Sequence, residues 1–224
     1  MNIGAFTNRA EAYVKARPGY PEEAIEYIRS LVPFDAVFAD IGAGTGILTA
    51  LLARHGYEIY AVEPNADMLE QLVITLAPFP KTKIFDGTAE TTKLPDNCVD
   101  VITNAQALKR FDINLFRAEC LRIGKTNPIV ITIFNCGNKA SAGYEKAIGI
   151  LYNNPDVRKF SNPLYFTREK WHLYYASMEG VPLKGDAGYE AWTAELDEKF
   201  DRENTDGVLH VNEMTYVYSE RIIR

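Results

Sequence analysis

A glycine-rich turn is the part of the sequence whose residue types and spacing point most directly to ligand binding. In the stretch FADIGAGTGILTALLA, residues 38–53, Gly42, Gly44 and Gly46 lie two residues apart where an apolar run meets a helical one. Such a turn lets the backbone approach a ligand, and the following helix presents free N–H groups. A dinucleotide turn has the spacing G-x-G-x-x-G, but Ile47 occupies the third glycine's place, and no lysine of a triphosphate loop follows. The spacing is therefore weak support for either phosphate ligand.

Two acidic residues accompany this turn. Asp40 ends the apolar run before it, and Glu63 lies 17 residues after Gly46, at the end of the next apolar run. An acid in that second position can accept both hydroxyl groups of a ribose. A ligand with a ribose, no phosphate and an ammonium group near Asp40 fits this layout, and S-adenosylmethionine has these features. The alternative for Asp40 is an acid that only caps a turn at a strand end.

Composition narrows the function classes. The chain has 224 residues, 47% of them hydrophobic, which predicts one domain with a substantial core. A net charge of -6 and a pI near 5.2 argue against a broad nucleic-acid surface. The three cysteines are odd in number and far apart, which predicts reduced thiols in a cytoplasmic protein and no metal site. No secretory signal and no membrane span are expected. His55, His172 and His210 are expected to be structural or exposed; of the three, only His172 lies in the expected substrate region.

The elements that must position these residues alternate along the first 135 residues. Strands are expected at 36–41, 57–63, 81–86, 99–105 and 128–135, and helices begin after Pro21, at 47, after Asn65 and after Asp112. This alternation predicts an α/β fold with a parallel sheet. Residues 140–175 are aromatic and are expected to be irregular. A late helix is expected to carry one stripe of apolar residues, formed by Tyr189, Trp192, Leu196 and Phe200. A final strand is expected at 212–221.

Several motifs together resemble one family. ADIGAGTGILTALLA, AVEPNADML and GTAETTKLPDNCVDVITNAQALKRFD are similar to the motifs of class I S-adenosylmethionine-dependent methyltransferases, in the type-11-like small-molecule branch. The opening YVKARPGYP and the late GDAGYEAW and DGVLHVNEMTYVY extend the resemblance over nearly the whole chain.

The resemblance implies a doubly wound, Rossmann-like, mostly parallel sheet of about seven strands. An antiparallel C-terminal strand would complete this sheet, and helical and aromatic insertions would lie over the site. It implies a single methyltransferase domain over 1–224. Within it, 1–35 would be an N-terminal lid and helix, 36–136 the cofactor-binding core, 137–185 a substrate-side insertion and 186–224 the C-terminal helix and edge strand.

The resemblance also implies roles for individual residues toward S-adenosylmethionine and its product S-adenosylhomocysteine. The three glycines would pass under the methionine part, and Glu63 would take the ribose hydroxyls. Around the ribose and adenine would lie Pro64, Asn65, Met68, Thr88, Ala89 and Glu90. Asn104 and Ala105 would lie by the sulfonium and the amino group, and Gln106 would face the methyl group. Tyr13, Arg17 and Tyr20 would form part of a lid, with Arg17 near a carboxylate. Few apolar anchors beyond Phe6, Tyr13 and Tyr20 lie in residues 1–20, so this segment is expected to become ordered when ligand binds.

The chain departs from the family after NAQA. The family commonly continues with His-Trp-Phe, whereas this chain has Leu108, Lys109, Arg110 and Phe111, and IGKTNP replaces the usual L-K-P-G-G. The histidine that could act as a base is absent. Either Lys109 and Arg110 both point to solvent, or one of them, with Arg110 the better candidate, pairs with an anionic acceptor. Gln106 and Arg110 are the candidate catalytic residues.

The expected partner is a small-molecule acceptor, anionic if Arg110 faces it, with no nucleic acid and no membrane, and the protein is expected to be a monomer or a homodimer. The alternatives are an RNA or protein methyltransferase and an inactive S-adenosylmethionine-binding module.

Overall fold

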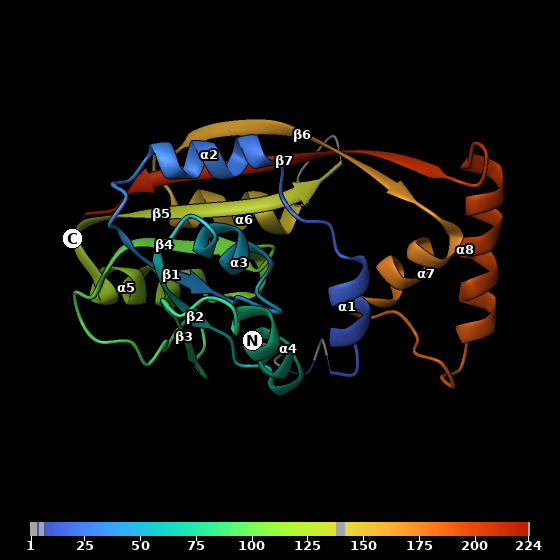
Figure 1. Ribbon diagram of the computed structural model, residues 1–224, viewed down its shortest axis with the longest axis horizontal. Helices are drawn as coiled ribbons and strands as arrows, with labels where there is room; N and C mark the ends of the chain where they lie inside the picture. The colour runs from blue at the N-terminus through green and yellow to red at the C-terminus, as the bar shows by residue number, and fades with distance from the viewer. Residues whose placement is uncertain (1–3, 5–6, 138–141, 224) are drawn as a thin grey trace.

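Five strands of near-continuous apolar sequence form the parallel half of the central sheet. In the computed structural model, which describes residues 4, 7–137 and 142–223, these strands are β1 (Val37–Ile41), β2 (Glu58–Val62), β3 (Thr82–Phe85), β4 (Val99–Ala105) and β5 (Gly124–Cys136). The sheet has seven strands in the order β3-β2-β1-β4-β5-β7-β6 (Figure 1). The strands from β3 to β5 in that order pair in parallel, and β7 (Leu209–Arg221) pairs with β5 antiparallel. The predicted fold is therefore confirmed.

Helices cover both faces of the parallel half, which is why its strands are apolar on both sides. On one face, α2 (Glu22–Ser30) and α3 (Ile47–Ala53) bury Ile25, Ile28 and Leu52 against the strands. On the other face, α5 (Ile113–Ile123) and α6 (Ala142–Leu151) do the same with Phe116 and Ala147. α4 (Ala66–Leu76) packs against α3 and the strand ends.

Two predicted N-caps are confirmed. The Asn65 side chain accepts a hydrogen bond from the Met68 amide at 3.0 Å, and Asp112 accepts from the amides of Asn114 and Leu115 at the start of α5. These caps fix where α4 and α5 begin, at the same edge of the sheet as the glycine turn.

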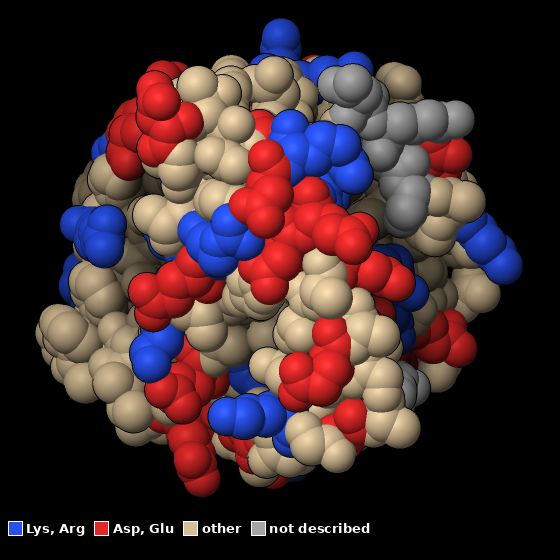
Figure 2. Space-filling view, turned by 90° about the vertical axis from the view of Figure 1, so that its right-hand side faces the viewer, with Lys and Arg blue, Asp and Glu red and all other residues tan. Residues whose placement is uncertain are grey.

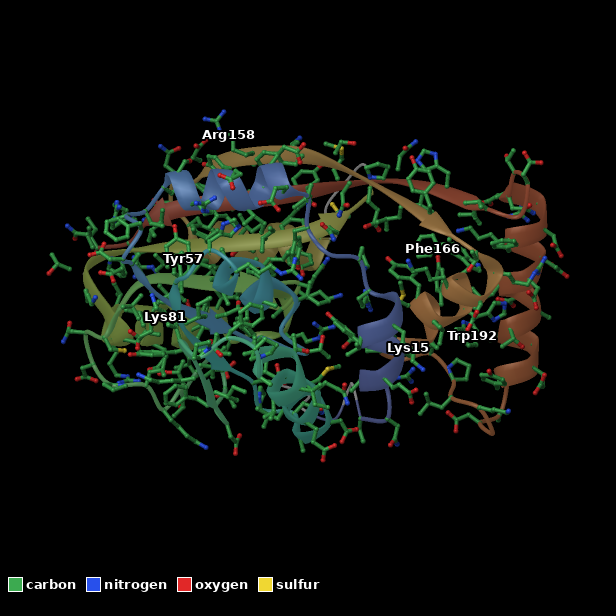
Figure 3. All side chains as sticks on the ribbon, viewed as in Figure 1. Lys15, Tyr57, Lys81, Arg158, Phe166 and Trp192 are labelled. Carbon is green, nitrogen blue, oxygen red and sulfur yellow. The ribbon has the colours of Figure 1, made fainter. Side chains whose placement is uncertain are left out.

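An outer layer of three helices lies beyond this edge of the sheet. We use the name outer layer for α1 (Ala10–Ala16), α7 (Arg168–Ala176) and α8 (Tyr189–Glu203). α7 and α8 connect the far ends of β6 (Asp156–Phe166) and β7, and α1 packs against α7 (Figure 1). It has a small core of its own, formed by Phe166, Trp171, Leu196, Phe200 and Leu209. Figure 3 shows Phe166 and Trp192 among these helices, well apart from Tyr57 beside the central strands.

The expectation that residues 140–175 are irregular was wrong. The described part of this region contains α6, β6 and α7. β6 was missed because it is an edge strand, paired only with β7. Most of its residues are exposed, and Pro163 and two basic residues interrupt any apolar alternation. Charges and proline are typical of edge strands, because they oppose pairing with another chain.

The N-terminal segment is fastened to the outer layer. The Arg9 side chain is buried and donates hydrogen bonds to the carbonyl oxygens of Ala176, at 2.9 Å, and Val181. On its other side, the Asn8 amide donates to Asp67 of α4 at 2.7 Å. Phe6, expected as an anchor of this segment, lies outside the described residues.

Candidate active site

The glycine turn has a conformation that explains its three glycines. Gly42, Gly44 and Gly46 have φ values of 71°, 58° and 89°, in the left-handed region that favours glycine. A Cβ atom on Gly42 would lie 2.9 Å from the Cβ of Ala107, and one on Gly46 would lie 2.8 Å from Leu72. A Cβ atom on Gly44 would meet nothing within 4 Å. Two of the glycines thus permit close packing, and Gly44 leaves open space on the side where a ligand can approach.

Glu63 lies directly against this turn. Its two carboxylate oxygens accept the backbone N–H groups of Gly44 and Asn65, both at 2.9 Å, and the residue is 7% exposed. Burial raises the pKa of Glu63, and these hydrogen bonds and the charge of Arg110 act in the opposite direction. Each oxygen keeps a further lone pair, so the carboxylate can still accept hydroxyl groups.

Asp40 is not available to a ligand. Its side chain is fully buried, and its oxygens accept hydrogen bonds from the hydroxyls of Thr49 at 2.6 Å and Thr103 at 2.9 Å. Burial raises the pKa of Asp40 to about 6 despite these bonds. Both oxygens thus tie β1 to α3 and β4, and an ammonium group near Asp40 stays a prediction.

The end of β4 presents Ala105 and Gln106 to the cavity, but not the side chain of Asn104. Asn104 is buried and donates to the hydroxyl of Thr132 on β5 at 3.0 Å. Gln106 adopts a positive φ of 59°, rare for a residue with a side chain, and this turns it toward the cavity. Its amide group donates to the Asn135 carbonyl at 3.3 Å and accepts from the Tyr144 hydroxyl at 3.4 Å.

Two connected cavities lie between the sheet edge and the outer layer. We call the first the glycine-turn cavity; its lining includes Gly42, Gly44, Tyr20, Asn135, Tyr174 and Glu213. We call the second the Arg110 cavity; its lining includes Lys109, Arg110, Met178 and Glu179. Tyr13, Arg17 and Gln106 line both. Residues that the sequence places far apart therefore converge here.

Arg17 lies between two aromatic rings at the junction of the cavities. Its guanidinium carbon is 5.0 Å from the Tyr13 ring centre and 5.3 Å from that of Tyr174. Its Nε–H is buried and has no hydrogen-bond partner among the described residues. One Nη donates to the Ser177 carbonyl at 3.4 Å, and the unpartnered Nε–H is suited to an anionic group.

Lys109 and Arg110 both line the Arg110 cavity, although Lys109 is exposed. The Arg110 side chain is 22% exposed, forms an ion pair with Glu179 at 3.1 Å and donates to the Gln106 carbonyl at 3.1 Å. Burial and the neighbouring Arg110 lower the pKa of Lys109. Neither sequence-based alternative describes this arrangement fully, because Arg110 faces the cavity and also pairs with the outer layer.

The segment expected at the adenine follows β3 at the same sheet edge. Ala89 and Met68 are buried, and Glu90 accepts the Asp112 amide at 2.9 Å. Thr88 forms a tight turn with Thr91, and Pro64 precedes the cap of α4. His172, by contrast, pairs with Asp197 of α8 at 2.9 Å within the outer layer.

Several cavity residues were not named as site residues from the sequence, among them Asn135, Tyr174, Met178, Glu179 and Glu213. Asn135 could have been found, because it ends an expected strand and ligands bind at the carboxyl ends of strands. Tyr174 and Glu213 carry no such signal, since their positions depend on the outer layer.

Comparisons with known proteins agree with this geometry. Residues 39–132 match a family described as a methyltransferase domain. An uncharacterized methyltransferase of Mycobacterium tuberculosis is 42% identical over 104 residues, which cover 46% of this chain and 40% of that protein. The match thus spans less than half of the relative's length.

Solved methyltransferase structures share the fold. A proposed type II methyltransferase from Anaeromyxobacter dehalogenans superposes with a TM-score of 0.68 and 18% identity, covering 92% of this chain and 98% of that one. A geranyl diphosphate C-methyltransferase from Streptomyces coelicolor, solved with S-adenosyl-L-homocysteine, has a TM-score of 0.51 and 14% identity, covering 90% and 79%. Among the described residues of this protein, no helix has the length and apolar character needed to cross a bilayer.

Proposed function

We propose that this chain is a class I S-adenosylmethionine-dependent methyltransferase and that it transfers a methyl group to a small-molecule acceptor. The observation that carries the proposal is the contact between Glu63 and the glycine turn, where a buried carboxylate lies beside the open space at Gly44. Such a pair suits a ligand with ribose hydroxyls and a chain that passes close to backbone.

The residues present fit S-adenosylmethionine, which supplies an activated methyl group when bound. In our proposal Glu63 accepts the ribose hydroxyls, and the segments 64–68 and 88–90 flank the ribose and adenine. Gly44 admits the methionine part, and the unpartnered Nε–H of Arg17 donates to its carboxylate. Gln106 faces the methyl group, where its anchored amide holds the acceptor in line.

A small and anionic acceptor fits the surroundings better than RNA does. The cationic side chains Arg17, Lys109 and Arg110 line two cavities that share part of their lining, and the outer layer covers both cavities. α8 carries six acidic and two basic residues. Figure 2 shows acidic side chains across the face of the molecule beyond the outer layer, which would repel a phosphate backbone.

We propose further that residues 1–224 act as one methyltransferase domain, with residues 7–20 as part of a lid. Cys98, Cys120 and Cys136 are all free thiols, which supports the proposed cytoplasmic location.

Replacing Glu63 by alanine tests the cofactor site. We expect S-adenosylhomocysteine affinity to fall by about 1.5–3 kcal/mol, roughly 10- to 150-fold, because hydrogen bonds to a charged acceptor are lost. Calorimetry with S-adenosylhomocysteine, NAD and ATP measures this, and only the first should bind the wild type well. Glu58→Ala, at the other end of β2, is the control and should bind normally. Unchanged affinity in Glu63→Ala would place the ribose elsewhere, and tighter NAD binding would refute the cofactor proposal.

Replacing Arg110 by alanine tests the anionic acceptor. We expect the KM for the acceptor to rise roughly 10- to 150-fold, equivalent to about 1.5–3 kcal/mol, because a charge-assisted pair with the acceptor is lost. S-adenosylhomocysteine affinity should stay nearly constant. Before the acceptor is identified, binding of the dicarboxylate glutarate to the S-adenosylhomocysteine complex is the readout. Lys109→Ala is the comparison, with a smaller effect because Lys109 is exposed. If glutarate binds equally to the wild type and to both single and double variants, the two cations are surface charges.

A further inference from the structure

The glycine-turn cavity carries a carboxylate that the proposed cofactor site above does not use. Glu213, near the start of β7, lines this cavity. The Tyr174 hydroxyl donates to its Oε1 at 3.3 Å. Its Oε2 is buried and has no hydrogen-bond partner among the described residues. A buried carboxylate oxygen without a donor is unfavourable, so this atom is suited to a group that a ligand brings.

The order of the strands places Glu213 on the opposite side of Gln106 from the glycine turn. The glycine turn follows β1, Gln106 follows β4, Asn135 lies near the end of β5 and Glu213 lies on β7. These strands are neighbours in the order β1-β4-β5-β7. Three interstrand steps of about 4.8 Å place β7 roughly 14 Å from β1. A donor whose methyl group faces Gln106 therefore leaves the β5 and β7 side of the cavity to the acceptor.

Glu213 and Arg17 carry opposite charges and line the same cavity. Among the described residues neither Glu213 nor Arg17 forms an ion pair, yet both line the same cavity, and the Tyr174 ring stacks on Arg17 while its hydroxyl holds Glu213. Burial raises the pKa of Glu213, and the Tyr174 hydrogen bond and the Arg17 charge oppose that rise. Because Arg17 is assigned above to the carboxylate of the cofactor, the atom left to satisfy is Oε2 of Glu213, which needs a cationic donor from the acceptor.

We propose, resting on the methyltransferase function above, that Glu213 binds the amino group of the methyl acceptor, so that the acceptor is an amine that also carries an anionic group. The anionic group lies toward Arg110, and the ammonium group lies on Oε2 of Glu213. An ammonium is favoured over a hydroxyl because a charge-assisted hydrogen bond to a carboxylate is the stronger of the two.

The same contact provides for the proton that N-methylation must remove. Glu213 accepts one proton from the bound ammonium, and the freed lone pair forms the N–C bond to the methyl carbon as the S–C bond breaks. The electron pair of that bond stays on sulfur, which becomes a neutral thioether. The product nitrogen carries the positive charge, and Glu213 returns its proton to solvent.

Two probes of equal length test the proposal on the full chain saturated with S-adenosylhomocysteine. The probe 5-aminopentanoate has one carboxylate and one ammonium, whereas glutarate has two carboxylates. We expect the wild type to bind 5-aminopentanoate at least tenfold more tightly. Glu213→Gln, which keeps an oxygen for the Tyr174 hydroxyl, should reduce this ratio to less than twofold. Glu190→Gln, the control at an exposed residue of α8 outside the lining of both cavities, should keep the ratio.

Each other outcome overturns the proposal. Equal binding of the two probes, a preference for glutarate, no binding of either, or an unchanged ratio in Glu213→Gln would each refute an amine at Glu213. A tenfold loss of S-adenosylhomocysteine affinity in Glu213→Gln would assign the carboxylate to the amino group of the cofactor instead. The wild type's own binding of S-adenosylhomocysteine tests the underlying function separately. If that binding fails, the proposed function fails, whereas intact binding without ammonium preference refutes only the role of Glu213.

Discussion

Replacing Trp171 by alanine is expected to unfold the outer layer while the parallel strands stay folded. Trp171 is 2% exposed, and its ring nitrogen donates to the Leu196 carbonyl at 3.2 Å. Its removal leaves a large cavity in a five-residue core, at a cost of about 3–5 kcal/mol. That core is separate from the clusters beneath the sheet, so the loss falls on local rather than global stability. Hydrogen exchange should accelerate in α7 and α8 but not in β1 and β4.

Trp171→Ala should affect the acceptor side of the site more than the cofactor side. Tyr174 and Glu213 depend on the outer layer, whereas Glu63 and the glycine turn do not. We therefore expect S-adenosylhomocysteine to bind the variant and acceptor-side probes to bind poorly. Trp192→Ala is the matched control and should cost less, because Trp192 is only partly buried. Uniform acceleration of exchange across the whole sheet would contradict this division.

Replacing Glu119 by alanine is expected to destabilise the fold by about 2–4 kcal/mol. Glu119 is 7% exposed, accepts the backbone N–H and the hydroxyl of Thr92 at 2.8 and 2.6 Å, and pairs with Arg122 at 2.7 Å. Its loss leaves the Thr92 amide buried without a partner and breaks one half of an ion pair. The loss of stability stays below that for a fully buried ion pair, because the Arg122 side chain is 37% exposed and retains its ion pair with Asp96. Urea unfolding measures it.

The contribution of Glu119 should also disappear in acid. Burial raises the pKa of Glu119, but the hydrogen bonds from Arg122 and Thr92 outweigh it, and the net pKa lies below the ordinary 4.5. A lowered folded pKa contributes stability above the unfolded pKa and loses it as pH falls through the folded one. The difference between wild type and Glu119→Gln should therefore be constant above about pH 5 and shrink toward pH 3. Asp96→Asn, at an exposed partner, should show little of either effect. A difference that grew on acidification would show that Glu119 does not act as a carboxylate.

The sequence predicted the parallel half of the fold because its signals there are local. Three features each determine structure within a few residues: the apolar runs that end in an acid, the helix caps at Asn65 and Asp112, and the glycine turn. They placed Glu63 against the turn and Gln106 at the cavity. The sequence could not show that Asp40 and Asn104 are buried and bonded to threonine hydroxyls, because those threonines lie on other elements.

The outer layer could not be predicted in the same way, because its elements depend on distant partners. β6 has no apolar alternation of its own and is a strand only because β7 pairs with it. Glu213 faces the cavity because of its register opposite Asn162, and Tyr174 because α7 packs on α1. No short motif encodes such contacts.

The order of the strands also determines when each strand can find its partner during synthesis on the ribosome. β6 emerges before β7, yet in the described part of the chain β7 is the strand with which it pairs, and roughly 40 residues separate the two. At about 5–20 residues per second, β6 waits for about 2–8 s without a partner. During that interval the nascent chain exposes eleven residues of unpaired strand, at a time when neighbouring nascent chains are close. Arg158, Lys159 and Pro163 then protect the chain from pairing with its neighbours, a task that ends when the last strand inserts.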